Sequence, residues 1–298
     1  MEKKLLAMPK SKIIVCIPAR YASTRFPGKV LAKDTGKFLI QHVYEQAKRA
    51  KLPSRVIIAA DDKRIAEAAK SFGAECIMTS PDCPSGTDRI AEAIKKLADS
   101  GQRTANRKSK KLHAERSPWR SLVLARRYTL NADDIVVNLQ ADEPEIDHAN
   151  IDAVAKLLVD NPKSQMATLA ADFETREQIA DPNIVKVVTT SIEHRASSIG
   201  NAIYFSRSVI PYDREQAGIG SKSNYLRHLG IYAYRKDFLL KITKLPQTPL
   251  EKIEKLEQLR AVENGFDILV AKVKHTCAGI DTPEQYVEFV KRYKNGHR

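Results

Sequence analysis

The chain contains the stretch Ile13-Ile14-Val15-Cys16-Ile17-Pro18-Ala19, followed by Arg20-Tyr21-Ala22-Ser23-Thr24-Arg25-Phe26-Pro27-Gly28-Lys29. Its first part is a short apolar run, which is typical of a buried parallel strand. Its second part holds three cations, Arg20, Arg25 and Lys29, with one glycine and no acidic residue. In open α/β sheets, a loop of this kind after the first strand binds phosphate-bearing ligands. We therefore expect a polyphosphate site at the carboxyl end of this strand.

Two residues of this loop have backbone properties that suit a phosphate site. Gly28 would let the backbone approach a phosphate closely, and Pro27 would stiffen that approach. The three cations would neutralise a triphosphate and the charge that develops during phosphoryl transfer. The alternative is a basic loop that only faces solvent.

Apolar runs and amphipathic stretches alternate through the first half of the chain. The expected strands are 13–18, 55–60, 75–78 and 135–139, and the expected helices are 38–50, 62–72 and 88–98. This alternation predicts βαβ units and a parallel sheet covered by helices on both sides. Right-handed crossovers then place the carboxyl ends of all these strands, and the motifs that follow them, along one edge.

The second half of the chain has a different pattern, in which strands follow one another. A helix over 151–159 precedes expected strands at 166–171, 185–190, 199–205, 229–234 and 266–273. Two further helices are expected, over 250–263, ending near Gly265, and over 282–293. We expect a mixed or antiparallel extension of the sheet that covers the edge where the carboxyl ends of the parallel strands lie. We expect a single α/β domain over residues 1–298.

Carboxylates follow two of the expected strands. Asp142 and Glu143 come directly after 135–139, and Asp281 follows the strand that ends at 273. Mg²⁺ binds through one or two carboxylates together with phosphate oxygens and water. Asp142 and Asp281 are therefore candidate Mg²⁺ ligands, and Gln140 could bind a ligand hydroxyl. The alternatives are a helix start or turn at Asp142-Glu143-Pro144 and an N-cap of the last helix at Asp281 or Thr282.

Three further segments carry polar side chains that could face a ligand. In Ser85-Gly86-Thr87-Asp88-Arg89, Ser85 or Thr87 is expected to cap a helix, and the same loop could contact a base or phosphate. In the strand around 225–234, period two puts Arg227 on the opposite face from His228, Tyr232 and Tyr234, unless Arg227 lies before the strand. A helical stretch carries the polar residues Glu254, Glu257, Gln258 and Arg260. The sequence does not show which way their side chains point.

The charge of the chain is concentrated in one stretch. The formal net charge is +14, and residues 100–130 contribute nine cations and one acid to it. A nucleic-acid-binding protein would spread basic residues over its folded face and interleave them with aromatic residues, so a basic surface insertion is the simpler interpretation.

The four cysteines lack metal-ligand spacing, and Cys16, Cys76 and Cys277 are expected to be buried thiols. No apolar stretch is long enough to span a membrane, and the basic N-terminus lacks a signal core, so we expect a cytoplasmic protein.

Seven motifs, taken in order, give the sequence a family resemblance. They are RYASTRFPGK, SGTDR, NLQADEP, YFSR with IP, LRHLGIYAYR, LEKIEKLEQLR and GIDTPE. Together they resemble the 3-deoxy-manno-octulosonate cytidylyltransferases from about residue 13 to 293, interrupted mainly by the basic insertion at about 100–130. The resemblance implies a nucleotide-diphospho-sugar transferase fold, a homodimer, and a Mg²⁺-dependent reaction of CTP with 3-deoxy-manno-octulosonate (Kdo) that serves lipopolysaccharide synthesis.

The resemblance also implies a role for each motif. Arg20 and Lys29 would grip the triphosphate, Arg25 and Gly28 would support it, and Asp142 and Asp281 would bind Mg²⁺. The nucleotide side would consist of Ser85, Gly86 and Arg89. The sugar pocket would consist of Gln140, Arg227, His228, Tyr232, Glu257 and Gln258, with Arg227 suited to pair with the sugar carboxylate.

The sequence departs from the family pattern at two motif positions. Ala141 stands where the family commonly has glycine, and Pro84 stands where a polar residue is usual. Ala141 could alter activity or sugar preference, and Pro84 could remove a nucleotide contact. A cytidylyltransferase for another acidic sugar, such as sialic acid or an 8-amino analogue of Kdo, is the close alternative, and a non-enzymatic nucleic-acid-binding protein is the remote one.

Overall fold

The computed structural model of the protein describes residues 11–23, 25–114, 130–190, 199–274, 276 and 279–296, with 101–114 described as backbone. Within these ranges, no helix combines the length and the apolar character that crossing a membrane requires. Cys277 and residues 115–129 of the basic insertion lie outside the described residues. Of the other expected buried thiols, Cys16 is buried and Cys76 is half-buried.

The first half of the chain forms the expected parallel sheet. Its strands are β1 (Ile13–Ala19), β2 (Arg55–Ala60), β3 (Glu75–Met78) and β4 (Ile135–Asn138). They lie in the order β3-β2-β1-β4, and every neighbouring pair is parallel. The carboxyl ends of β1 and β4 therefore meet at one edge, as the alternating pattern predicts.

The second half extends this sheet with strands of mixed direction. They are β5 (Met166–Asp172), β6 (Lys186–Thr189), β7 (Ile199–Ser206), β8 (Leu226–Arg235) and β9 (Ile268–Val273). β8 runs antiparallel between β4 and β5, so within the described residues all nine strands form one continuous sheet. β6 pairs with both β7 and β8, which closes β8, β5, β9, β7 and β6 into a ring.

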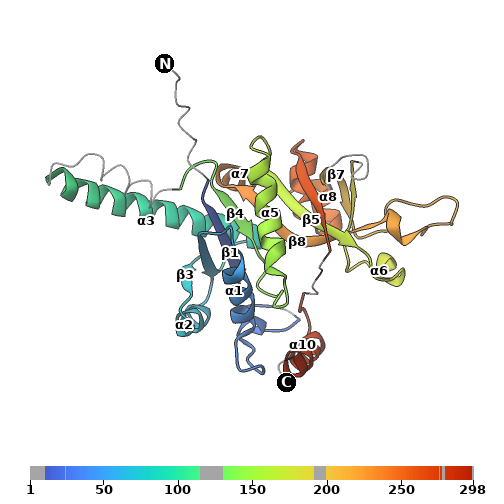
Figure 1. Cartoon of the computed structure of the whole chain (residues 1–298), viewed down its shortest axis with the longest axis horizontal. Coiled ribbons are helices and arrows are strands. Elements are labelled where there is room, and N and C mark those ends of the chain that lie inside the picture. Colours follow the sequence, from blue (N-terminus) through green and yellow to red (C-terminus); the bar gives the residue numbers. More distant parts are fainter. Residues whose placement is uncertain are drawn as a thin grey trace, which may run out of the picture.

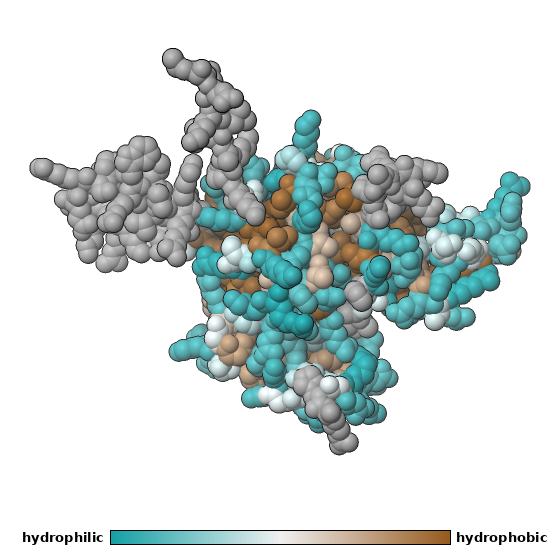
Figure 2. Space-filling model, viewed as in Figure 1, coloured by the Kyte–Doolittle hydropathy of each residue, from teal (hydrophilic) through white to brown (hydrophobic). Residues whose placement is uncertain are grey.

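Helices cover both faces of the sheet, because alternate residues of each strand point to opposite faces. Ile13, Val15 and Ile17 of β1 pack with α1 (Leu39–Arg49), α2 (Lys63–Ser71) and α5 (His148–Asp160). Ile14 and Cys16 pack on the other face with α3 (Gly86–Ala114), α7 (Lys236–Ile242) and α9 (Leu259–Glu263). Figure 1 shows α5 lying across the sheet, and Figure 2 shows hydrophobic residues beside it on an otherwise mostly hydrophilic face.

Helix α3 is longer than its sequence pattern indicates. A helix over 88–98 is expected, whereas α3 begins at Gly86 and continues to Ala114. Its second half extends well beyond the sheet in Figure 1. The first part of the basic insertion therefore continues the backbone of a core helix.

The expectation of one helix over 250–263 is wrong. The structure has α8 (Pro249–Glu254) and α9 instead, separated at Lys255, whose backbone is left-handed with φ 54°. Gly265 follows α9 with φ 74°, in agreement with its expected role at the helix end. The short helix α6 (Glu177–Ala180) and helix α7 are absent from the expected pattern.

The last helix, α10 (Pro283–Gly296), packs against the basic loop rather than against the sheet. Tyr286 and Phe289 of α10 form a small apolar cluster with Leu39, Ile280 and the neighbouring Phe26. The Tyr286 hydroxyl also accepts a hydrogen bond from the backbone N–H of Asp34 at 2.8 Å. This packing holds the loop after β1 close to the segment that carries Asp281.

Candidate active site

A cavity of about 770 Å³ lies where the carboxyl ends of β1 and β4 meet the mixed part of the sheet. It brings together the loop after β1, the segment after β4, the start of α3, strand β8 and the break between α8 and α9. The residues predicted from the sequence that line it are Arg20, Arg25, Lys29, Ser85, Gly86, Arg89, Gln140, Asp142, Arg227, His228, Tyr232, Glu257, Gln258 and Asp281. Residues that are far apart in the sequence thus surround one space.

Gly28 is the predicted site residue that does not line the cavity. Its φ is +70°, and its backbone N–H donates to the carbonyl of Tyr21 at 3.0 Å. A Cβ at this position would lie 3.2 Å from the Tyr21 ring. Gly28 therefore closes the loop on itself, and the expectation that it brings the backbone close to a phosphate is not supported.

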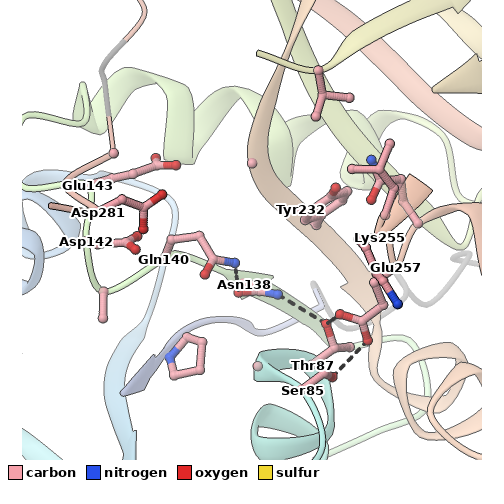
Figure 3. Close-up of a pocket in the computed structure, with 18 of the residues that line it drawn as sticks. Ser85, Thr87, Asn138, Gln140, Asp142, Glu143, Tyr232, Lys255, Glu257 and Asp281 are labelled. Atoms are coloured by element: carbon pink, nitrogen blue, oxygen red, sulfur yellow. Dashed lines mark hydrogen bonds between the residues drawn. The ribbon is translucent and has the colours of Figure 1, made fainter. Parts of the chain in front are cut away.

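Lys29 lies between two carboxylates at one end of the cavity. Its Nζ is 2.6 Å from Asp142 Oδ2 and 3.1 Å from Asp281 Oδ1, and it also donates to the carbonyl of Ile280 at 2.8 Å. Arg25 pairs with the other oxygen of Asp281 at 2.9 Å. Figure 3 shows Asp142, Glu143 and Asp281 gathered at this end. The site concentrates both charges that triphosphate binding requires, cations for the phosphates and carboxylates for a metal ion.

Backbone contacts explain why the two aspartates meet. The backbone N–H of Ile280 donates to the carbonyl of Asp142 at 2.8 Å, which joins the segment after β4 to the segment before α10. The cap of α10 comes from Thr282, whose Oγ1 accepts from the N–H of Gln285, and Gln285 Oε1 accepts from the N–H of Asp281. Asp281 therefore does not cap α10, because its carboxylate faces Arg25 and Lys29 instead.

The donor set at this end fits Mg²⁺. Asp142 and Asp281 already place two carboxylates around one positive charge, the Lys29 ammonium. Mg²⁺ prefers oxygen ligands and normally keeps several waters or phosphate oxygens beside one or two carboxylates. Within the described residues, no group of three or more His, Cys, Asp or Glu side chains could hold a metal ion by itself. The remaining ligands would thus have to come from a bound phosphate and from water.

A half-buried glutamate, Glu257, lies on the other side of the cavity. Glu257 lies 2.9 Å from both Ser85 Oγ and Thr87 Oγ1, and burial raises the pKa of its carboxyl. Ser85 Oγ also accepts from the N–H of Asp88 at 3.1 Å, so Ser85 caps α3 as predicted. Figure 3 shows this cluster connected through Asn138 to Gln140. The break after α8 is what brings Glu257 to this position.

Arg89 lines the cavity, but its guanidinium is bound to protein groups. Its NH2 pairs with Asp61 at 3.2 Å, and its NH1 donates to Thr79 Oγ1 at 2.8 Å and to the carbonyl of Ser80 at 3.1 Å. Its side chain is only 4% exposed. Asp61 also accepts from the backbone N–H of Tyr21, so Arg89 supports the start of the basic loop through Asp61.

Strand β8 contributes Arg227, His228 and Tyr232. Arg227 and His228 are expected on opposite faces of the strand, yet both line the cavity. The reason lies at the edge of β8: residues 232–235 pair with β4, and residues 226–227 pair with β6. Between these two ladders the edge opens onto the cavity, so neighbouring residues can border the same opening.

His228 is buried, and its hydrogen bonds indicate its tautomer. Its Nε2 is 3.1 Å from Thr168 Oγ1, which also lies 3.2 Å and 2.8 Å from the carbonyls of Leu229 and Ile231. Carbonyls only accept, so the Thr168 hydroxyl donates to one of them and must accept from His228 Nε2–H. Nδ1 is therefore left as an acceptor. Burial lowers the pKa of His228 to about 3.

Several lining residues have no predicted site role from the sequence, among them Asn183, Ile184, Val185, Arg207 and Lys255. The first three form the turn that leads into β6, and Asp181 Oδ1 accepts from the backbone N–H of Asn183 at 2.8 Å. The motif Asp181-Pro182-Asn183 is a turn signal, but it carries no sign of which neighbour the turn meets. Residues 183–185 reach the cavity because β6 closes the ring of strands.

Comparisons with known proteins agree with this geometry. A protein-family model described as cytidylyltransferase matches residues 14–107 and 112–268. A 3-deoxy-manno-octulosonate cytidylyltransferase of Solibacter usitatus is 43% identical over 287 residues, covering 96% of this chain and 96% of the relative. One of Thermodesulfovibrio yellowstonii is 44% identical over 275 residues, covering 91% and 94%.

Solved structures give the same result for the fold. A structure of CMP:2-keto-3-deoxy-manno-octonic acid synthetase complexed with CTP has a TM-score of 0.76 at 35% identity, and the match covers 96% of this chain and 100% of that one. A 4-diphosphocytidyl-2C-methyl-D-erythritol synthase has a TM-score of 0.56 at 9% identity, which bears on the fold alone. The expected nucleotidyltransferase fold is confirmed. With relatives more than 40% identical over nearly its whole length, the chain belongs to the 3-deoxy-manno-octulosonate cytidylyltransferases within the wider cytidylyltransferase family.

Proposed function

We propose that this chain transfers the CMP group of CTP to Kdo, forming CMP-Kdo and pyrophosphate. The observation that carries the proposal is the cavity itself. It joins a phosphate end, built from Arg20, Arg25 and Lys29 with two aspartates, to an end lined by Arg227, His228 and Glu257. The named relatives and the CTP complex of a related synthetase support this choice of nucleotide and sugar.

The reaction needs an in-line displacement at the α-phosphate. The anomeric hydroxyl of Kdo attacks the α-phosphorus, a new P–O bond forms, and the bond to the β-phosphate breaks. Pyrophosphate leaves, and the hydroxyl proton passes to water or to the departing pyrophosphate. Arg20 and Lys29 would bind the triphosphate and stabilise the charge that develops at the α-phosphate, with Arg25 beside them. Lys29 donates to Asp142, Asp281 and the carbonyl of Ile280, so it would exchange some of these contacts for phosphate oxygens when the triphosphate binds.

Asp142 and Asp281 would hold Mg²⁺ against the phosphates. When bound, Mg²⁺ would screen the phosphate charges, help position the nucleophile and stabilise the leaving group. The two carboxylates come from separate segments joined by the Ile280–Asp142 backbone hydrogen bond. This contact would keep the spacing between them constant during turnover.

The sugar would lie between β8 and the segment that follows α8. Arg227 would pair with its carboxylate, the Nδ1 of neutral His228 would accept from a hydroxyl, and Glu257 and Gln258 would bind further hydroxyls. Burial of these groups would discriminate against sugars that lack a matching polar group, because an unpaired buried group is costly.

The direct test is to incubate the protein with CTP, Kdo and Mg²⁺ and to follow both products. We expect pyrophosphate and a CMP-sugar phosphodiester in equal amounts, the second identified by ³¹P NMR, with little turnover of ATP. Release of pyrophosphate without a sugar ester, or equal turnover of ATP and CTP, would contradict the proposal.

The family resemblance further supports a cytoplasmic homodimer. Light scattering of the purified protein tests the dimer, since a mass of one chain at working concentration would exclude it. Cell fractionation tests the compartment.

A further inference from the structure

We propose that Lys186 is the positioning residue for the sugar end of the cavity, which consists of residues 183–185, Arg207, Arg227, His228 and 255–258. The proposal rests on the proposed function, because it concerns how the acidic sugar is held. Lys186 itself does not line the cavity. It acts through the backbone of the residues that do.

The ammonium of Lys186 is fully enclosed and uses all of its donors. Lys186 is 0% exposed, and its Nζ donates to the carbonyls of Asp181 at 2.9 Å, Ile184 at 2.8 Å and Arg207 at 2.5 Å. Such a group is costly to bury unless every donor is paired. The three acceptors lie on two separate chain segments, so one cation joins the turn before β6 to the end of β7.

Lys186 is also joined through the backbone to the residues proposed to bind the sugar. It pairs with Arg227 in the ladder between β6 and β8, and the N–H of His228 donates to the carbonyl of Val185 at 2.9 Å. The turn before β6 is therefore joined directly to the backbone at Arg227 and His228, whose other edge pairs with β5. Loss of the Lys186 hydrogen bonds would release the β6 side of this support.

The same connection continues to the break after α8. Glu254 accepts from Ser206 Oγ at 2.5 Å and from the N–H of Arg207 at 2.9 Å. Arg207 in turn donates through Nε to the carbonyl of Glu254 at 2.8 Å and through NH1 to that of Pro182 at 3.1 Å. Residues 255–258 begin directly after this contact and line the cavity. Three chain segments of the sugar end thus meet at Arg207, which Lys186 holds.

The phosphate end has separate supports. Lys29, Asp142 and Asp281 are held by the Ile280–Asp142 hydrogen bond and by the packing of α10. Loss of the Lys186 hydrogen bonds should therefore weaken sugar binding and leave CTP binding intact. A residue with a general structural role would lower stability without separating the two substrates.

The test is to measure both KM values for the Lys186→Met variant. We expect the KM for the acidic sugar to rise by about tenfold or more and the KM for CTP to change by less than about twofold, since misplaced binding groups lose much of their effect. Arg235→Met is the matched control. Arg235 is 8% exposed and donates to the carbonyls of Ser164, Asp133 and Leu158, but it lies at the other end of β8 and does not line the cavity.

Arg235→Met should lower the unfolding temperature, as Lys186→Met does, and leave both KM values unchanged. An equal effect of the two variants on the sugar KM, or none from Lys186→Met, would overturn the proposal. If Lys186→Met does not fold, Lys186→Gln keeps two N–H donors and should give a smaller rise in the same KM; a rise in both KM values would overturn the proposal there. A wild-type protein that turns over no acidic sugar would instead refute the proposed function.

Discussion

At the residue scale, the chemistry centres on Lys29 and its two carboxylate partners. Both aspartates follow strands in the sequence, and the rule that strand ends share an edge is sufficient to predict their proximity. The rule gives no information on Lys29 lying between them at 2.6 Å and 3.1 Å. That arrangement depends on α10, which packs from the far end of the chain against the loop after β1.

The Asp142→Asn variant tests the proposed role of this carboxylate. The amide keeps the size of the side chain but removes the negative charge that faces Lys29, so we expect kcat to fall by at least about a hundredfold with the fold retained. Circular dichroism and pyrophosphate release with CTP and Mg²⁺ measure the two effects. Asp172→Asn is the control, because Asp172 pairs with Lys272 in an exposed contact and should leave activity unchanged. Full activity of Asp142→Asn would remove both the metal and the phosphate assignment.

His228 should make stability depend on pH. Burial lowers its pKa from 6.5 to about 3, so the unfolded state binds the proton first as the pH falls. The stability this supplies is present above pH 6.5 and is lost as the pH falls toward 3. Between pH 7 and pH 5 the wild type should lose about 2 kcal/mol of unfolding free energy from this group.

The measurement is urea unfolding of the wild type and of His228→Gln at both pH values. The variant has no imidazole to protonate, so its loss between pH 7 and pH 5 should be smaller by that amount. Parallel losses in the two proteins would show that His228 is not buried as a neutral group.

At the scale of elements, the hydrophobic period predicts the strands and most helices. The main exception is the single helix expected over 250–263. The apolar residues Leu250, Ile253, Leu256 and Leu259 recur every three residues through the break, so the local pattern does not mark it. At the break, Glu254 makes tertiary contacts with Ser206 and Arg207, which no local pattern contains. This departure from regular helix is also what brings Glu257 and Gln258 into the cavity.

The backbone at Lys255 gives a stability prediction at this scale. A non-glycine residue in the left-handed region costs roughly 1–2 kcal/mol, and glycine avoids most of it. Comparing Lys255→Gly with Lys255→Ala removes the side chain in both, and we expect the glycine variant to be about 1 kcal/mol more stable in urea unfolding.

Lys252, inside α8, is the matched control and should give the opposite sign. There Gly should be about 1 kcal/mol less stable than Ala, because helix interiors disfavour glycine. The same sign at both positions would contradict the left-handed backbone at Lys255.

At the scale of the whole molecule, one continuous sheet links the nucleotide half to the sugar half. β8 makes this link, because it pairs with β4 on one side and with β5 on the other. The sequence indicates the change from alternating to consecutive strands, and hence a mixed extension. The closing of β6 onto β8 could not be predicted, since strand pairing between distant segments leaves no local signal. For that reason the sequence does not indicate that residues 183–185 line the cavity.

On the proposed function, this cavity serves one nucleotide and one class of acidic sugar. The most direct measurement is pyrophosphate release with CTP and Mg²⁺ in the presence of Kdo, its 8-amino analogue and sialic acid, compared at equal sugar concentrations. We predict release with Kdo well above that with the other two. Preference for another acid would keep the phosphate end and contradict the assigned sugar. If folded protein releases no pyrophosphate with any of the three sugars, the proposed function is contradicted.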